Sequence, residues 1–160
     1  MFIKKISTLI FIGLLSYLQA DVLKGKVIGI SDGDTIKILT QDDKQYKIRL
    51  NDIDAPEKSQ AFGNKSKENL SNYIFGKYVT VEYKNIDRYQ RILGTVYYQG
   101  EDINIQQVKD GFAWVYKQYS NKIEYYKAEL ESKVNKRGLW IDNNPIEPWN
   151  YRKKNKWKKI

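Results

Sequence analysis

The sequence predicts an α+β fold in which short β-strands close into a small barrel, with helices inserted between them and added after them. Three observations support this prediction. Strand-like segments recur along the chain, helical segments with end signals fall between and after them, and no repeat or low-complexity linker divides them. With 160 residues, of which 41% are hydrophobic, the chain is long enough to bury a core.

The strands are predicted from residue type and from alternation. The first segment is rich in β-branched residues, and the second alternates apolar and polar residues as a half-buried strand does. The polar run 40–44 predicts a turn, after which the third segment returns with the same alternation. The five predicted strands are residues 22–30, 34–39, 45–50, 78–83 and 92–98.

Two helices are predicted between or after these strands from spacing and glycine stops. Residues 64–74 follow Gly63 and stop before Gly76. Residues 104–110 form a shorter segment that stops at Gly111.

A third helix is predicted near the C-terminal end. Asn121 and Glu124 have the spacing of a capping box, and residues 136–138 (Lys-Arg-Gly) supply the charge and the glycine that favour a helix end. Between them, apolar residues recur at helical spacing: Ile123, Tyr126, Leu130 and Val134. Five strands and about three α-helices in this order favour a five-stranded OB-type β-barrel.

The composition excludes several kinds of catalytic site. Because the chain has no histidine and no cysteine, it has no Ser–His or Cys–His pair, no thiolate, no disulfide and no zinc ribbon. Any catalysis must therefore use carboxylates, Arg, Lys, Tyr and hydroxyls. The metal that suits such side chains is a hard cation that prefers oxygen ligands.

The first twenty residues have the pattern of an export signal. Lys4 and Lys5 precede an apolar run over residues 6–18, and a plausible cleavage site follows Ala20. An uncleaved N-terminal anchor is the alternative. We therefore expect an exported protein, secreted or periplasmic after cleavage near Ala20.

The basic residues are concentrated at the C-terminal end. The chain has 28 Lys+Arg against 19 Asp+Glu, and residues 151–160 hold six Arg or Lys and no acid. The predicted organisation is a signal peptide (1–20), one folded domain (21–150) and a basic tail (151–160). The tail suits a polyanion or an anionic envelope surface, and it equally suits a solubilising end.

Two acidic segments lie at ends of predicted strands. Asp32, Gly33 and Asp34 lie at the start of the second strand, and residues 51–57 hold three acids directly after the third. Each segment alone is typical of an ordinary turn or a solvated loop. Beside arginines such as Arg49, however, the acids can bind a divalent cation, and the cation and guanidinium groups together can bind a phosphate.

Six motifs follow one another along the chain: residues 32–35 (DGDT), 48–50 (IRL), 53–57 (IDAPE), 87–91 (DRYQR), 111–116 (GFAWVY) and 138–140 (GLW). In this order and with this approximate spacing, they resemble the staphylococcal nuclease (thermonuclease) family over about residues 22–149. The resemblance implies an OB barrel with helices and a calcium-dependent phosphodiesterase that cuts both DNA and RNA.

The resemblance also implies a set of metal ligands. Asp34 and Asp54 match the carboxylates that bind Ca²⁺, and Ala55 matches a residue that contributes its backbone carbonyl. Asp32 matches an acid that supports the metal site without binding the ion.

The resemblance also implies residues that act on the attacking water, on the scissile phosphate and on a nucleobase of the substrate. Glu57 matches the residue usually assigned as the general base for the attacking water. Arg49 and Arg91 match the two arginines that hold the scissile phosphate, whose cleavage leaves a 3′-phosphate. Tyr89 and Tyr119 are expected to contact the substrate, Tyr119 by stacking on a base.

One departure from the family pattern and two rival functions remain open. Gln90 stands where the family usually has glycine, which costs on the order of 1 kcal/mol if that position needs a positive φ. A non-catalytic nucleic-acid-binding OB module is the alternative function, and a scaffold that binds envelope polymers through its tail is a third. The retained acids favour the enzyme, acting as a monomer on DNA and RNA with no stable protein partner implied.

Overall fold

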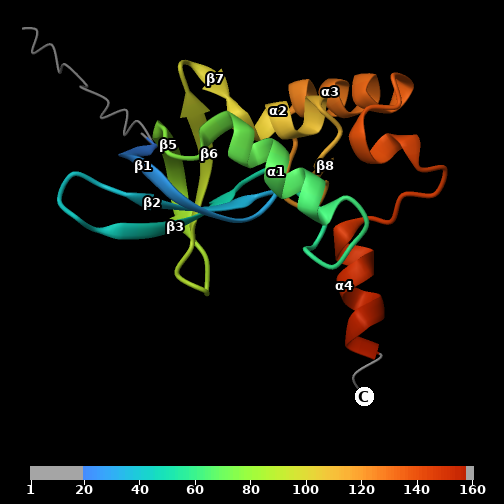
Figure 1. Cartoon of the computed structure of the whole chain (residues 1–160), viewed down its shortest axis with the longest axis horizontal. Helices are drawn as coiled ribbons and strands as arrows, with labels where there is room; N and C mark the ends of the chain where they lie inside the picture. The colour runs from blue at the N-terminus through green and yellow to red at the C-terminus, as the bar shows by residue number, and fades with distance from the viewer. Residues whose placement is uncertain (1–19, 158–160) are drawn as a thin grey trace, which may run out of the picture.

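Five strands close into a barrel in the computed structural model, which describes residues 20–157 (Figure 1). Antiparallel pairing gives the order β3-β2-β1-β5-β6, and a parallel pairing of β3 with β6 closes the ring. The predicted five-stranded barrel is therefore confirmed. The strands are β1 (Asp21–Asp32), β2 (Thr35–Leu39), β3 (Gln45–Leu50), β5 (Tyr78–Ile86) and β6 (Ile92–Tyr98).

Three short strands complete the β-structure. β7 (Glu101–Asp102) folds back on β6 and extends the barrel sheet. β4 (Ile53–Asp54) pairs with β8 (Trp114–Val115) in a separate two-stranded sheet beside it. This small sheet matters for function because it fixes the segment that follows β3, where three acids lie.

The three predicted helices are present, and the chain forms one that was not predicted. The helices are α1 (Gly63–Ile74), α2 (Ile103–Lys109), α3 (Ile123–Val134) and α4 (Pro148–Trp157), with a 3₁₀ turn η1 (Gly138–Ile141). All four lie to one side of the barrel strands, and α4 stands beside the loop that leads into α1 (Figure 1). The predicted boundary between domain and tail, at residues 150/151, falls inside α4.

Two details of α3 differ from the sequence prediction. Its N-cap is Lys122, and no side chain caps the helix, so the capping box predicted at Asn121 is wrong. The apolar residues that indicated the helix mostly face solvent, since Ile123, Leu130 and Val134 are 68%, 63% and 74% exposed. The face that packs inward carries Tyr125, Ala128, Glu129 and Ser132.

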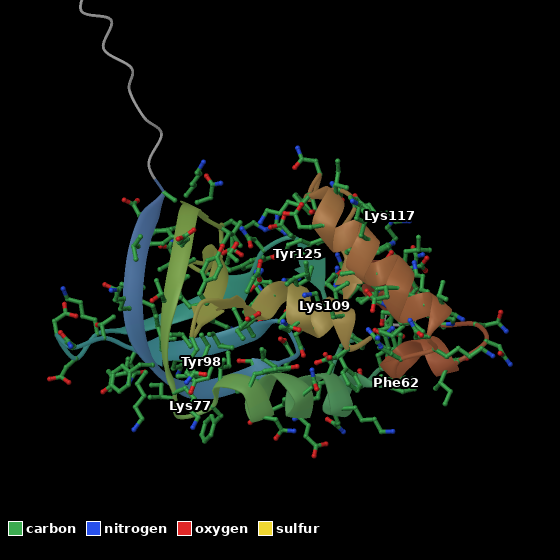
Figure 2. All side chains as sticks on the ribbon, turned by 90° about the horizontal axis from the view of Figure 1, so that it is seen from above. Phe62, Lys77, Tyr98, Lys109, Lys117 and Tyr125 are labelled. Carbon is green, nitrogen blue, oxygen red and sulfur yellow. The ribbon has the colours of Figure 1, made fainter. Side chains whose placement is uncertain are left out.

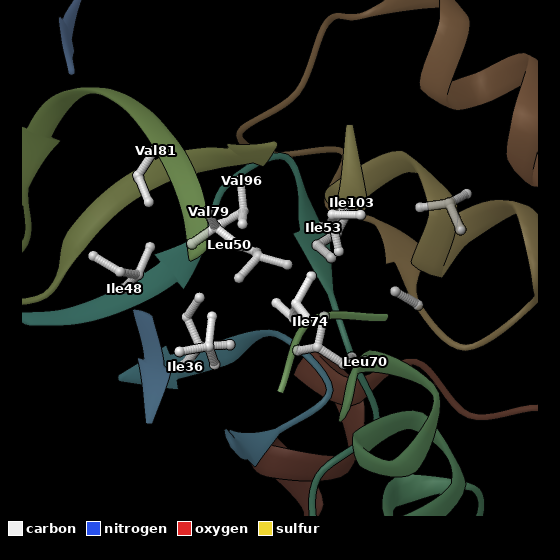
Figure 3. Packing of buried hydrophobic residues seen from close by; sticks show 14 of the residues in the cluster. Ile36, Ile48, Leu50, Ile53, Leu70, Ile74, Val79, Val81, Val96 and Ile103 are labelled. Atoms are coloured by element: carbon white, nitrogen blue, oxygen red, sulfur yellow. The ribbon is translucent and has the colours of Figure 1, made fainter. Parts of the chain in front are cut away.

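Aliphatic side chains from all five barrel strands and from α1 and α2 fill the core (Figure 3). The fully buried members include Ile36, Ile48, Leu50, Leu70 and Ile103. A second, aromatic cluster holds the C-terminal elements together. It consists of Trp114, Leu139 and Trp140, with Phe62 and Trp149 packed against them.

Viewed from above, the barrel and the helices form two adjoining parts of the molecule (Figure 2). Tyr98 lies on the barrel, whereas Phe62 lies at the opposite end, next to the C-terminal segment. The predicted signal segment lies outside the described residues except for Ala20. Within residues 20–157, no helix has the length and apolar character that a membrane span requires.

Candidate active site

Two buried carboxylates converge where the barrel meets the small sheet. Asp34, at the start of β2, is 5% exposed, and Asp54, in β4, is 1% exposed. Arg49 Nη2 lies 3.1 Å from Asp34 Oδ2 and 3.0 Å from Asp54 Oδ1. Because one nitrogen contacts both carboxylates, the two carboxylates lie close enough together to share one positively charged partner.

The turn before β2 is fixed by α1 and α2. Asp32 Oδ1 accepts a hydrogen bond from the backbone N–H of Asp34 at 3.2 Å. The buried Gln107 amide of α2 donates to the carbonyl oxygens of Gly33, at 2.7 Å, and Ser66, at 3.0 Å. A side chain at position 33 would collide with Ser66, so only glycine allows this close approach.

The segment after β4 is tied directly to the first acid. The backbone N–H of Ala55 donates to Asp34 Oδ2 at 2.6 Å. The structure thereby brings together Asp34, Asp54 and Ala55, which the resemblance implied as ligands of one metal site.

Arg49 holds this arrangement from the end of β3. Its Nη1 donates to the backbone carbonyl of Leu50 and, at 2.9 Å, to that of Ile53. Its side chain is only 12% exposed. Both Nη atoms are therefore engaged by protein oxygens, and Arg49 acts in this structure as the bridge between the two acids.

The electrostatics of the cluster favour a further positive charge. Burial raises the pKa of Asp34 to about 7, and the nearby carboxylates of Asp32 and Asp54 add to the rise. The Arg49 guanidinium and the N–H of Ala55 oppose it. The positive charges around such a buried carboxylate do not fully offset its negative charge. A bound cation would supply the additional positive charge.

Glu57 lies at the open side of the buried pair, with its side chain 36% exposed. Its Oε1 accepts a hydrogen bond from Arg152 Nη1 at 2.8 Å. The same guanidinium binds Asp54 with both Nη atoms, at 3.1 Å to Oδ1 and 2.8 Å to Oδ2. Glu57 is therefore joined to the acid pair through Arg152.

Arg152 was not among the site residues predicted from the sequence, because residues 151–160 were assigned to a basic tail. A helix-start signal was present in the sequence. Pro148 occupies the first turn of α4, where proline is favoured because its missing N–H and fixed φ suit a helix start. That signal indicates an ordered helix in place of a tail.

Helix α4 is anchored to the loop that follows Glu57. The hydroxyl of Tyr151 donates to the carbonyl of Ser59 at 2.9 Å and lies 3.1 Å from the Ser59 hydroxyl. Gln60 donates to the carbonyl of Ile146 at 2.6 Å, and its side-chain oxygen accepts from the N–H of Glu57 at 3.1 Å. Between loop and helix lies a cavity of about 120 Å³, lined among others by Pro56, Phe62, Trp114, Leu139, Ile146 and Tyr151.

Arg91 and Tyr89 lie on a different feature, the turn between β5 and β6. Arg91 binds Asp87 Oδ2 through Nε at 2.8 Å and through Nη2 at 2.7 Å. Within residues 20–157, no ion pair joins Arg91 to Asp34, Asp54 or Glu57. In this structure Arg91 is therefore paired with Asp87 and not with an acid of the site.

Tyr89 is available at the surface of that turn. Its ring is 63% exposed, and it lies beneath the guanidinium groups of Arg88 and Arg91, 4.8 Å and 5.5 Å from its centroid. In the same turn, Gln90 has a φ of 60°, so the position where the family usually has glycine does require a left-handed backbone.

Tyr119 lies at the outer end of an aromatic row. It is 66% exposed and meets Tyr116 edge to face at 4.7 Å, and Tyr116 stacks on Trp149 at 5.5 Å. Trp114 and Trp140 are 7% and 8% exposed, so they serve as packing residues.

The donor set fits a hard divalent cation. Two carboxylates approach one point, and a third, on Glu57, lies beyond Arg152. Among the described residues, no three acids lie close enough together to hold one ion by themselves. The remaining ligands would therefore be backbone carbonyl, water and substrate oxygens, as is common for calcium.

Much of the chain matches a known protein family. The family described as staphylococcal nuclease homologue matches residues 47–142, which is more than half of the chain. The matched range includes Arg49, Asp54 and Glu57 and ends before α4.

Curated relatives cover almost the whole chain. A Haemophilus influenzae protein named "uncharacterized endonuclease" is 48% identical over 150 residues, which are 94% of this chain and 84% of that protein. An Escherichia coli protein with the same name is 42% identical over 93% of this chain and 97% of its own length. A Shigella flexneri protein named "micrococcal nuclease" is 40% identical over 83% of this chain and 82% of its own.

Proposed function

Because the chain belongs to the staphylococcal nuclease homologue family, we propose that it is an exported, calcium-dependent nuclease that hydrolyses phosphodiester bonds of DNA and RNA. One observation carries the proposal, which is the convergence of Asp34, Asp54 and Glu57 on arginine side chains at a partly open site. A protein that only binds a polyanion gains nothing from three acids at its binding surface, since they repel phosphate.

In this proposal Asp34 and Asp54 hold the calcium ion, with the backbone carbonyl of Ala55 beside them and Asp32 supporting the turn. The bound ion supplies positive charge that polarises the phosphate and offsets charge in the transition state. The residues of the chain hold these ligands in position, because the side chains of Asp34 and Asp54 are buried and Arg49 bridges them.

Glu57 is proposed to handle the attacking water. Its carboxylate is half-buried, outside the buried pair, so a water molecule can reach it from solvent. Glu57 orients this water and takes up its proton as the water oxygen attacks phosphorus. The bond from phosphorus to the 5′-oxygen breaks, that oxygen takes a proton from solvent, and a 3′-phosphate remains.

The test is cleavage of single- and double-stranded DNA and of RNA by residues 21–160, in Ca²⁺, in Mg²⁺ and in excess chelator. We expect calcium-dependent cleavage that falls by at least about 10²-fold in Glu57→Ala, the range in which general-base catalysis contributes. Glu68→Ala, which removes an exposed acid from α1, is the matched control and should cleave like the unmodified chain. Salt-sensitive DNA binding without cleavage in any metal would instead support a non-catalytic binding module.

Export is proposed from the basic and apolar pattern of residues 1–20. Expression of the full chain in a bacterial host, followed by fractionation and N-terminal sequencing, tests it. The proposal expects a product that starts near Asp21 outside the cytoplasm. A full-length product retained in the cytoplasm would contradict it.

A further inference from the structure

We propose that Arg152 of α4 is a substrate-binding residue of this active site, whose guanidinium exchanges Asp54 and Glu57 for the scissile phosphate. The proposal rests on the proposed nuclease function and adds a residue from outside the segment that matches the family. In this proposal, helix α4 forms part of the lining of the active site.

The contacts of Arg152 place it where a phosphate would bind. Its guanidinium lies 2.8 Å from both Asp54 Oδ2 and Glu57 Oε1, so it touches a proposed metal ligand and the proposed water-handling group together. A scissile phosphate must lie between the cation and the attacking water. Arg152 therefore reaches the position that the phosphate occupies.

The three arginines of the proposed site differ in their freedom to bind an incoming anion. Arg49 is 12% exposed and also binds two backbone carbonyls, so it is a fixed part of the site. Arg91 is held by Asp87 and, among the described residues, forms no ion pair with Asp34, Asp54 or Glu57. Arg152 is 38% exposed, and within residues 20–157 its hydrogen bonds go only to carboxylates.

An exchange of carboxylate for phosphate fits the chemistry of a guanidinium group. Its planar fork binds the paired oxygens of a carboxylate or of a phosphate with the same geometry. Once Asp34 and Asp54 bind a cation, that cation supplies the positive charge that Arg152 gives Asp54 in this structure. The guanidinium is then available to the phosphate.

Because α4 is anchored to the loop that follows Glu57, Arg152 is positioned by a fixed helix and not by a mobile tail. The preceding residue, Tyr151, is hydrogen-bonded to Ser59, and Gln60 is hydrogen-bonded to the carbonyl of Ile146. Both partners belong to the loop that begins at Glu57. The helix and the water-handling residue are thus positioned by one set of contacts.

The experiment compares Arg152→Ala, Arg152→Lys and Lys153→Ala. Lys153 is an exposed neighbour on the same helix, so its variant removes one positive charge without touching the acids. We expect Arg152→Ala to lower kcat/KM for single-stranded DNA at saturating Ca²⁺ by about 10²-fold, the typical loss of one transition-state donor. Arg152→Lys should recover only part of this loss, because an ammonium cannot bind bidentately.

Calcium titration by calorimetry, without nucleic acid, gives a second readout. Because Arg152 competes with the cation for Asp54, Arg152→Ala should bind Ca²⁺ more tightly than Lys153→Ala does. Equal calcium affinity in the two variants would overturn the exchange.

The remaining outcomes separate this proposal from the nuclease function itself. If the unmodified chain cleaves and Arg152→Ala matches Lys153→Ala, only the role of Arg152 is overturned. If Arg152→Ala cleaves faster than the unmodified chain, the contact of Arg152 with Asp54 and Glu57 inhibits cleavage, and the proposal is overturned. If the unmodified chain cleaves in no metal, both the nuclease function and this role fail.

Discussion

At the scale of single residues, one guanidinium bridges the acid pair. Asp34 and Asp54 are almost fully buried, and Arg49 Nη2 is within 3.1 Å of both. Buried charges are costly unless they are paired, and without Arg49 the carboxylate of Asp34 would lose its ion-pair partner among the described residues. This arrangement stabilises a binding geometry more than it stabilises the fold.

Loss of the Arg49 guanidinium should therefore be strongly destabilising. We expect Arg49→Ala to lower the free energy of unfolding by about 3 kcal/mol in chelator, measured by urea denaturation. The matched control is Lys44→Ala, which breaks the exposed 2.8 Å pair with Asp42 and should cost less than about 1 kcal/mol. Equal losses in the two variants would show that the site does not depend on the bridge.

The backbone of the turn that carries Tyr89 is slightly strained. Gln90 has a φ of 60°, a left-handed conformation that glycine adopts without steric cost. We expect Gln90→Gly to raise the free energy of unfolding by about 0.5–1 kcal/mol, measured in the same way. Gln41→Gly, in a turn where the replaced residue does not have a positive φ, should give no gain. A loss of stability in Gln90→Gly would contradict the account of this turn.

At the scale of secondary-structure elements, the sequence predicts the strands of the barrel but does not predict which face of α3 is buried. Alternation and β-branched residues fix strands such as β3 and β6, whose predicted bounds the structure reproduces. Spacing alone indicates a helix without saying which face it buries. In α3 the buried face includes Glu129, which binds the N–H of Val115 at 2.9 Å, so a polar contact orients the helix.

The solvent-facing position of the apolar residues in α3 makes a clear prediction. Leu130 is 63% exposed, so Leu130→Lys should change the free energy of unfolding by no more than about 0.5 kcal/mol. Tyr125 is 1% exposed and bonds Asp102 at 2.7 Å, and Tyr125→Ala should cost about 3 kcal/mol or more. Thermal or urea unfolding of the two variants measures this. A larger loss for Leu130→Lys would mean that the helix is rotated from the orientation described.

At the scale of the whole molecule, the site is assembled from segments that are far apart in the chain. Asp34, Arg49, Asp54 and Glu57 lie within residues 34–57, and the resemblance to the family implied their roles from motifs in that segment. Arg152 comes from α4, about a hundred residues later. Nothing local in a lysine-rich segment indicates an ion pair at that distance, because such a contact is created only by tertiary packing.

The proposed function requires that the acid pair bind the calcium ion needed for cleavage. Calorimetric titration of Ca²⁺ into the unmodified chain, Asp54→Asn and Asp43→Asn tests it most directly, since Asp43 is an exposed turn residue away from the site. We predict one site in the unmodified chain and in Asp43→Asn, and at least about tenfold weaker binding in Asp54→Asn, because one charged ligand is lost. Equal binding in all three proteins, or none in the unmodified chain, would contradict the claim.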